Sequence, residues 1–413
     1  MHRVLLLGAG KIGATIAKLL SRGEGYDILV ADVAGQALAP LDGLPRVRTV
    51  ELDSRNPGRL AHAMCDRHSV VSALTYSLNP GIAGAAAEAG LSYFDLTEDV
   101  ATTRRVAQIA ATARPGQIFM PQCGLAPGFV AIAGHALTQQ FERLDTVRLR
   151  VGALPLFPTN ALKYNLTWST DGLINEYGNA CEAITEGRLR EVMPLEGLEH
   201  FSLDGVDYEA FNTSGGVGTL CHTLVGKVRT LDYKTIRYRG HRDLIAFLMT
   251  ELQLTRRRAL LKDILENAVP VTPQDVVLLF CTVTGWRDGR LTEITDARKI
   301  YHGPCCGAPC SAIQRTTAAS LCAVLELHVQ GKLPQQGLVR QEDVALGDFV
   351  SNRFGRCFDG TASTASAWDP ATPLPDSRHL ADDESGPERP GTQGDGNGLC
   401  ARRPARPSAQ AGR

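Results

Sequence analysis

The sequence predicts an α/β protein: a doubly wound parallel sheet (a Rossmann fold) with an inserted α+β domain that contains a mostly antiparallel sheet. In the first 123 residues, short apolar runs alternate with helical segments, as in parallel strands joined by helical crossovers. A Gly-x-Gly-x-x-Gly turn follows the first apolar run directly. After residue 145, several segments alternate polar and apolar residues, which is typical of antiparallel strands.

The first strand and its turn predict a dinucleotide site. The apolar run at residues 4–7 has the pattern of a strand buried on both faces, and a helix is expected from Ala14 to Leu20. Glycines in this turn allow a tight bend, backbone approach to a pyrophosphate, and close packing of helix on strand. The free N–H groups of the helix start favour phosphate binding. The residues assigned to the cofactor here are Gly8, Gly10, Lys11, Ile12 and Gly13.

The end of the second strand indicates which dinucleotide is bound. The apolar residues 28–31 end in Asp32, nineteen residues past Gly13. A carboxylate at this position accepts hydrogen bonds from the ribose hydroxyls and repels a 2′-phosphate. Because no Arg or Lys follows before Arg46, the sequence favours NAD over NADP.

Four more parallel strands are expected, at residues 47–52, 69–74, 91–96 and 117–122, with helices at 59–67, 81–90 and 102–113. The carboxyl ends of such strands form the crevice in which dinucleotides lie. Asp53 is therefore expected near the adenine. Leu74, Thr75, Tyr76 and Gly124 are expected near the nicotinamide half.

The chain is divided into four parts by its changes in pattern. Residues 1–123 form the predicted dinucleotide-binding domain, and residues 124–337 form a substrate and dimerisation domain. Residues 338–358 form a closing segment that packs back on the first domain. From residue 359 to 413 the chain has almost no large apolar residues, so a disordered tail is predicted.

The inserted domain is expected to combine strands and helices. The predicted strands are residues 146–152, 228–238, 276–284 and 290–301, with a hairpin at 199–211 that turns at 203–205. The predicted helices are residues 129–141, 242–252, 256–268 and 311–330.

Composition and charge exclude several classes of partner. The formal net charge is −1, which does not suggest nucleic acid or an acidic membrane surface. No apolar run approaches the roughly 20 residues that cross a bilayer, and no signal peptide is recognised. Eleven scattered cysteines predict reduced thiols and a cytoplasmic protein. Cys305, Cys306 and Cys310 lack the paired spacing of a zinc site, so no metal is expected.

Several segments in a fixed order carry a family likeness. The glycine turn is followed by Thr75-Tyr76-Ser77, then by the run from Tyr93 to Glu98, and then by Gly124-Leu125-Ala126-Pro127-Gly128. Within the insertion come the run from Lys163 to Ser169 and the run from Lys234 to His241. Over residues 1–358 the chain resembles the saccharopine dehydrogenase family, and it is most similar to the lysine 6-dehydrogenase branch. The loop at residues 305–310 and the tail match nothing in that pattern.

The resemblance implies an NAD-dependent oxidoreductase that acts on the C–N bond of lysine or a lysine derivative. Hydride would leave the ε-carbon, and hydrolysis of the imine would give 2-aminoadipate 6-semialdehyde and ammonia. One alternative is saccharopine cleavage with release of glutamate, which requires a larger basic pocket; whether Arg148, Arg150 and Arg239 converge is left open by the sequence. An alternative of another class is a non-catalytic NAD-binding sensor or scaffold. A homodimer or higher homo-oligomer is expected.

Candidate catalytic residues come from three segments. Asp95 ends the fifth strand, Lys163 would be a base if buried, and His241 titrates near neutrality. Each has a structural alternative: Asp95 and His241 can cap helices, and Lys163 can be a solvated residue at a strand edge. Cys123 is interpreted as a packing residue rather than a nucleophile.

The candidate substrate-binding residues surround these positions. Arg237 is suited to a bidentate contact with a carboxylate, and Asp171 is suited to an ammonium group, although helix capping explains Asp171 equally well. The complete set of expected substrate-binding residues is Glu98, Asn165, Trp168, Asp171 and Arg237.

Overall fold

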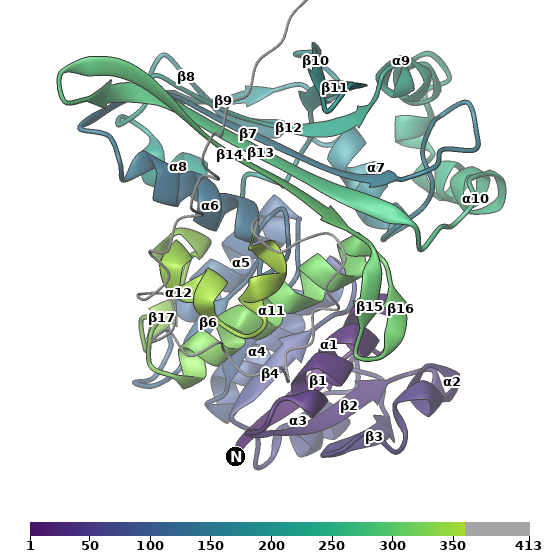
Figure 1. Ribbon diagram of the computed structural model, residues 1–413. Coiled ribbons are helices and arrows are strands. Elements are labelled where there is room, and N and C mark those ends of the chain that lie inside the picture. The colour runs from purple at the N-terminus through teal and green to yellow at the C-terminus, as the bar shows by residue number, and fades with distance from the viewer. Residues whose placement is uncertain (360–413) are drawn as a thin grey trace, which may run out of the picture. The chain divides into compact units, whose positions relative to one another are not determined.

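The computed structural model describes residues 1–359, which Figure 1 shows as ribbons. Apart from Asp359, the tail that was predicted to be disordered lies outside the described residues.

Seven parallel strands form the first sheet, in the order β17-β6-β5-β4-β1-β2-β3. Their bounds are β1 His2–Leu7, β2 Tyr26–Asp32, β3 Val47–Glu51, β4 Ser69–Ser72, β5 Ser92–Asp95, β6 Ile118–Met120 and β17 Gly337–Leu338. The six strands predicted in the first 123 residues are all present, so the prediction of a doubly wound parallel sheet is confirmed.

Helices cover both faces of this sheet (Figure 1). They are α1 Lys11–Arg22, α2 Gly35–Leu38, α3 Pro57–Met64, α4 Asn79–Ala89, α5 Val100–Ala110 and α11 Ala312–Val329. Both faces of strand β1 are covered, which explains why its residues 4–7 are all apolar. Val4 and Leu6 pack into the core with α1 and α11, whereas Leu5 and Leu7 pack into the core with α3, α4 and α5.

The end of the described chain returns to the parallel sheet. Strand β17 pairs with β6, and Gln341 donates from Nε2 to the Pro121 carbonyl at 2.9 Å. The short elements that follow are η5 Gln341–Asp343, α12 Leu346–Ser351 and η6 Gly355–Phe358. In η6, the ring of Phe358 stacks on Phe129 with centroids 3.9 Å apart.

Eight strands form the sheet of the inserted domain, with a main path β10-β11-β12-β7-β13-β14 and with β8 and β9 at its side. Their bounds are β7 Arg143–Pro155, β8 Cys181–Thr185, β9 Arg188–Val192, β10 Glu199–Leu203, β11 Val206–Asn212, β12 Thr230–Tyr238, β13 Asp275–Arg287 and β14 Arg290–Tyr301. Only β12 and β7 pair in parallel among the strands of this sheet, so the prediction of a mostly antiparallel sheet is confirmed.

The helices of this part surround the sheet. They are α6 Phe129–Thr138, α7 Thr170–Gly178, α8 Leu220–Leu224, α9 His241–Ala246 and α10 Arg258–Ala268, and α9 continues as a π-helical turn over Phe247–Glu251. The sequence did not predict α7, α8, the β8–β9 pair or the small hairpin of β15 Gly303–Cys305 and β16 Ala308–Cys310. All five residues of β9 are at least partly exposed, so the strand lacks the alternation by which the others were found.

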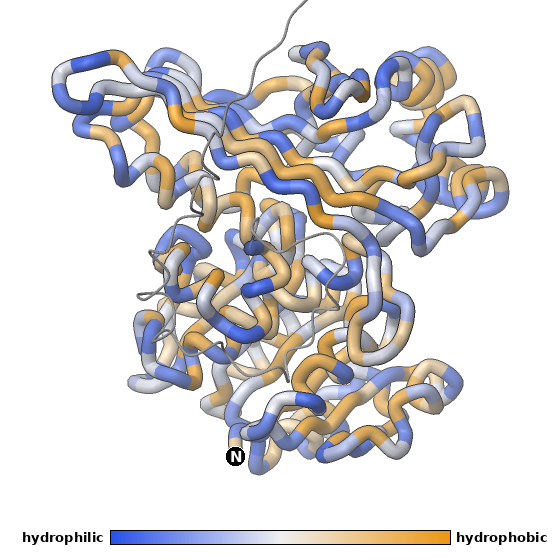
Figure 2. The backbone as a smooth tube through the Cα atoms, in the orientation of Figure 1, coloured by the Kyte–Doolittle hydropathy of each residue, from blue (hydrophilic) through white to orange (hydrophobic). Residues whose placement is uncertain are grey.

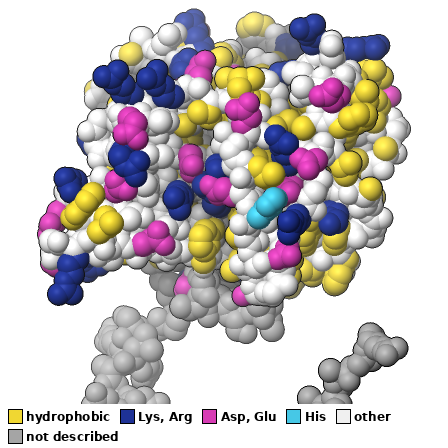
Figure 3. All heavy atoms as spheres, turned by 90° about the horizontal axis from the view of Figure 1, so that it is seen from above, with side chains coloured by type: hydrophobic (Ala, Val, Ile, Leu, Met, Phe, Trp, Pro, Cys, Tyr) yellow, Lys and Arg dark blue, Asp and Glu magenta, His cyan; other side chains and the backbone are white. Residues whose placement is uncertain are grey.

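Hydropathy follows this architecture. Figure 2 shows hydrophobic stretches along strands of both sheets and a hydrophilic turn between β13 and β14. On the face shown in Figure 3, basic and acidic side chains are interspersed. Within the described residues, no helix combines the length and the apolar character that a membrane span needs.

Candidate active site

The glycine turn between β1 and α1 is tightly packed at two of its glycines and open at the third. Gly8 has φ +99°, and a Cβ atom there would lie 2.9 Å from the Ala73 carbonyl oxygen. A Cβ atom on Gly13 would lie 1.9 Å from the Gly8 carbonyl oxygen. A Cβ atom on Gly10 would meet nothing within 4 Å. The turn thus has the open backbone surface at Gly10 that a pyrophosphate requires.

Asp32 connects this turn to the end of β2. Its Oδ2 atom accepts a hydrogen bond from the Ala9 N–H at 2.7 Å, and its Oδ1 atom accepts one from the Ala34 N–H at 2.9 Å. Asp32 also lines a cavity of about 290 Å³ together with Asp53 and Arg55. The carboxylate therefore stabilises the glycine turn and faces the space expected for the adenosine half.

A larger cavity of about 670 Å³ begins at the glycine turn and extends to the sheet of the inserted domain. Of the residues predicted to bind cofactor, those that line it are Gly10, Lys11, Ile12, Gly13, Leu74, Thr75, Tyr76 and Gly124. Of the residues predicted to bind substrate, those that line it are Glu98, Trp168, Asp171 and Arg237. The structure thus brings the two predicted sets into one continuous space.

Two carboxyl groups of this cavity are shielded from water. Burial is the main cause that raises the pKa of Glu98 to about 7, and the nearby carboxylate of Asp99 raises it further. Burial also raises the pKa of Glu176 to about 8, while Arg237 lowers it and Glu98 raises it further. The Oε2 atom of Glu176 is buried and makes no hydrogen bond to a described residue. Such groups are suited to proton transfer near neutral pH.

Arg237 is the buried cation of this cavity, and 2% of its surface is exposed. Burial opposes its charge, but Tyr177, Tyr164 and Glu176 outweigh that effect and raise its pKa above the ordinary guanidinium value. Its Nη2 atom lies 3.8 Å from Oε2 of Glu176. The Arg237 guanidinium carbon lies 5.0 Å from the ring centroid of Tyr164, a cation–π distance.

Trp168 and an ion pair complete the wall. Asp171 lies in the first turn of α7, which Ser169 caps with its side chain, and its Oδ2 atom is 2.6 Å from Nζ of Lys262 on α10. A Cβ atom on Gly172 would lie 2.3 Å from the Trp168 ring, so this glycine lets the indole pack against α7.

The structure does not bring Asp95, which was predicted to be catalytic, into the cavity. Asp95 is fully buried and does not line the cavity. It accepts hydrogen bonds from the Tyr93 hydroxyl at 2.7 Å, the Thr97 N–H at 2.9 Å and the Gln122 N–H at 3.0 Å. These three donors occupy the carboxylate, so Asp95 holds the ends of β5 and β6 together.

Lys163, His241 and Asn165 also lie outside the cavity. Lys163 is exposed and donates from Nζ to the Arg239 carbonyl at 3.0 Å, so it is not the desolvated base that the sequence suggested. Burial, followed by repulsion from Arg237, lowers the pKa of His241 to about 3, which leaves it neutral near pH 7. Asn165 is buried, and its Oδ1 atom accepts from Asn160 at 3.3 Å.

The described cysteines include Cys123, which was interpreted as a packing residue. Cys123 is fully buried, and its thiol donates to the Met120 carbonyl at 3.0 Å, which is a packing role. Among the residues that the structure describes, no group of three or more Cys, His, Asp or Glu side chains is arranged to hold a metal ion.

The sequence analysis missed several polar residues of the cavity, namely Glu176, Tyr233, Thr235, Lys262 and Glu266. Glu176 had a usable signal: it follows the capping residue Ser169 on a helix whose Leu173 and Tyr177 are buried. An acid three residues after a buried apolar position, as Glu176 is after Leu173, lies on the same side of the helix. It was missed because α7 itself was not predicted.

Comparisons with known proteins agree with this architecture. Residues 4–117 match the model of the saccharopine dehydrogenase NADP binding domain, and residues 124–353 match that of the saccharopine dehydrogenase C-terminal domain. A curated relative, saccharopine dehydrogenase [NADP(+), L-glutamate-forming] of Schizosaccharomyces pombe, is 22% identical over 265 residues, which are 60% of this chain. The chain spans 57% of the length of that relative.

Two solved structures share the fold. The apo saccharopine dehydrogenase (L-Glu forming) of Saccharomyces cerevisiae has a TM-score of 0.68 at 16% identity, with 87% of this chain and 96% of that chain covered. The homospermidine synthase of Legionella pneumophila, in complex with NAD, has a TM-score of 0.58 at 12% identity, with 87% and 90% covered. The two family models together cover most of the chain, so this protein, with its pyridine-nucleotide-binding domain, belongs to the saccharopine dehydrogenase family.

Proposed function

We propose that this protein is an NAD-dependent oxidoreductase that acts on the C–N bond of lysine or a close lysine derivative. The observation that carries this proposal is the charge of the larger cavity. Its ionisable lining residues are the acids Glu98, Asp171, Glu176 and Glu266 and the bases Lys11, Arg237 and Lys262. Lys11 belongs to the glycine turn, and Lys262 is already paired with Asp171. The remaining wall suits a substrate with two ammonium groups and one carboxylate.

The acids have separate roles in this proposal. When bound, the dinucleotide would supply the hydride acceptor. An amine must be neutral before its carbon loses hydride, so a base must take a proton from the ε-ammonium. Glu98 is the proposed base, because a pKa of about 7 keeps a large share of it ionised at neutral pH. Glu176 is proposed to bind an ammonium group, since its Oε2 atom is buried and accepts no hydrogen bond from a described residue.

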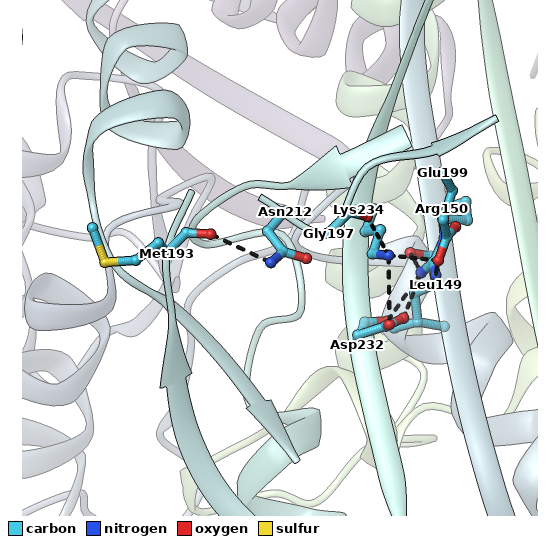
Figure 4. Close-up of polar contacts among 8 residues, drawn as sticks. All are labelled: Leu149, Arg150, Met193, Gly197, Glu199, Asn212, Asp232 and Lys234. Carbon is cyan, nitrogen blue, oxygen red and sulfur yellow. Dashed lines mark hydrogen bonds and ion pairs between the residues drawn. The ribbon is translucent and has the colours of Figure 1, made fainter. Parts of the chain in front are cut away.

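The alternative substrate, saccharopine, finds less support in this cavity. The three arginines whose convergence the sequence left open, Arg148, Arg150 and Arg239, do not line it. Arg150 instead forms ion pairs with Glu199 at 2.8 Å and with Asp232 at 2.6 Å. Figure 4 marks these contacts with dashed lines. A substrate with three carboxylates would meet Arg237 as the one buried basic residue of the described cavity wall. The name of the curated relative nevertheless makes saccharopine the second candidate.

NAD is proposed as the cofactor because of Asp32. Its carboxylate faces the cavity expected for the adenosine ribose, where a 2′-phosphate would be repelled. The opposing observation is Arg55, which lines the same cavity but lies 2.9 Å from Asp53 in an ion pair. A 2′-phosphate would have to compete with Asp53 for this guanidinium.

The test is a turnover assay with purified protein. Lysine, saccharopine, ornithine and other amino acids are supplied with NAD or NADP, and reduced nicotinamide is followed by absorbance. Reduction of NAD with lysine supports the proposal. Activity on saccharopine but not on lysine would show that saccharopine, the second candidate, is the substrate. Dinucleotide binding without turnover on any amine would instead favour the sensor or scaffold hypothesis.

Assembly and compartment remain predictions. We keep the homodimer or higher homo-oligomer as a proposal that light scattering after gel filtration tests, and the cytoplasm as the proposed location.

A further inference from the structure

The three nitrogens of the Arg237 guanidinium differ in how many hydrogen bonds they donate. Its Nε–H donates to the Tyr177 hydroxyl at 2.8 Å. Its Nη1 donates to the Thr235 hydroxyl at 2.9 Å and to the Ile236 carbonyl at 2.8 Å. Its Nη2 makes no hydrogen bond to a described residue and has only the 3.8 Å contact with Glu176. Three donated bonds thus fix the guanidinium plane and leave the two N–H groups of Nη2 for a ligand.

Tyr177 is held in turn by His241. The Tyr177 hydroxyl lies 3.0 Å from Nε2 of His241, and Nδ1 of His241 lies 2.8 Å from the Leu162 carbonyl oxygen. A carbonyl oxygen only accepts, so the proton of the neutral imidazole lies on Nδ1. Nε2 must then accept from Tyr177, and the Tyr177 oxygen accepts from Arg237. Every hydrogen bond in this chain therefore has one direction.

The chain is enclosed by protein. The exposed fractions are 3% for Tyr177 and 1% for His241. The His241 ring lies among aromatic rings, with centroids 5.4 Å away in Tyr164, 5.9 Å in Tyr177 and 6.4 Å in Phe211. A second proton on His241 would place a charge beside Arg237, and burial together with that repulsion keeps the imidazole neutral. His241 therefore acts as a fixed acceptor.

From this geometry we propose that Tyr177 and His241 are positioning residues, which orient the Nη2 group of Arg237 to bind the carboxylate of an amino-acid substrate. This inference rests on the proposed function for the identity of the substrate. A guanidinium held by a single hydrogen bond could rotate, whereas one held at Nε and Nη1 presents a fixed donor pattern to a planar carboxylate. The network would thus distinguish amino acids from amines that lack a carboxylate.

The test compares two fragments of lysine as binding probes, measured by calorimetry with NAD present. One is 6-aminohexanoate, which keeps the carboxylate, and the other is 1,5-diaminopentane, which lacks it. Tyr177→Phe should raise the dissociation constant of 6-aminohexanoate about tenfold, which corresponds to one buried charged hydrogen bond, and should change that of the diamine less than about twofold.

Two comparisons separate positioning from a general loss of structure. Tyr238→Phe is the matched control: Tyr238 lies next to Arg237 on β12, its hydroxyl donates to the Pro155 carbonyl at 2.9 Å, and it does not line the cavity. It should leave both probes unaffected. His241→Leu should act like Tyr177→Phe, while His241→Gln, which retains an acceptor oxygen near Nε2, should restore affinity for 6-aminohexanoate. If Tyr177→Phe does not fold, the comparison of His241→Leu with His241→Gln tests the positioning role.

The outcomes distinguish this inference from the proposed function. Equal weakening of both probes by Tyr177→Phe, failure of wild type to bind 6-aminohexanoate, or no difference between His241→Leu and His241→Gln would each overturn it. If the selectivity for the carboxylate holds but lysine is not oxidised, the reaction assignment fails and the positioning role stands.

Discussion

The Nη2 atom of Arg237 lies 3.8 Å from the Oε2 atom of Glu176, with both side chains buried in the wall of the cavity. This separation exceeds a hydrogen bond, so neither side chain satisfies the hydrogen-bonding capacity of the other. A zwitterionic group placed at this wall could bring a carboxylate to the arginine and an ammonium group to the glutamate. The pair therefore matches the two charges of an amino acid.

Glu176→Gln should change how stability depends on pH. The pKa of Glu176 is about 8 in the folded protein against an ordinary value of 4.5, so the folded state favours the protonated form. Its contribution to stability is present below about pH 4.5 and is lost as pH rises toward 8. The glutamine resembles the protonated acid, so the melting temperature of the variant should increasingly exceed that of wild type over this interval, in the absence of ligand. Parallel melting profiles would contradict this prediction.

Glu98→Gln should remove most of the turnover. If Glu98 is the base, kcat/KM of wild type rises with pH through about 7, where its carboxylate forms. The variant should lose this rise and retain turnover lower by about 10²–10⁴-fold, the usual contribution of a positioned base. Glu191→Gln, at an exposed position of β9, is the matched control and should match wild type. A variant with an unchanged pH profile would exclude Glu98 as the base.

Asp95→Asn should reduce stability rather than catalysis. Asp95 now accepts hydrogen bonds from two N–H groups and one O–H group. The amide of asparagine replaces one acceptor oxygen by an NH2 donor, so at least one of these three donors loses its acceptor. The expected loss is about 1–3 kcal/mol of unfolding free energy, measured by urea denaturation. Near-normal stability combined with a large loss of kcat would return Asp95 to the catalytic candidates.

Two glycine variants should separate cofactor binding from folding. Gly10→Ala adds a Cβ atom that meets no protein atom within 4 Å, so the melting temperature should stay near that of wild type. The added methyl occupies the approach of the pyrophosphate and should raise the dissociation constant of NAD about tenfold, for a clash of roughly 1–3 kcal/mol.

Gly13→Ala should instead destabilise the protein. Alanine normally favours a helix interior over glycine by about 1 kcal/mol, but here its Cβ atom would lie 1.9 Å from the Gly8 carbonyl oxygen. The melting temperature should therefore fall. An unchanged or raised melting temperature would show that the turn relaxes.

The parallel sheet was predictable because strands that are buried on both faces are visible in the sequence as short apolar runs. Val70 and Val71 are neighbours in β4 and both have no exposed surface, so apolar residues occupy both faces of the strand instead of alternating with polar ones. Strand β9 was missed for the opposite reason, since exposed strands carry no such signal.

The candidate site was only partly predictable. The sequence shows that Asp95 ends a strand and that Glu98 follows the same strand. It does not show that Asp95 accepts hydrogen bonds from buried groups of the protein, whereas Glu98 lines the cavity. It likewise does not show which helix brings an acid across from Arg237. Those facts depend on contacts between the inserted sheet and the ends of the parallel strands.

Strand β17 has a consequence for the order in which the protein folds during synthesis. Its Gly337 N–H donates to the Gln117 carbonyl at 3.0 Å, and the Val339 N–H donates to the Phe119 carbonyl at the same distance. The edge of the nucleotide-binding sheet is therefore closed by a segment made more than two hundred residues after β6. A ribosome-bound chain that stops in the insertion leaves β6 with an open edge, so the first half of the protein to emerge is completed only when nearly all of the second half has been made.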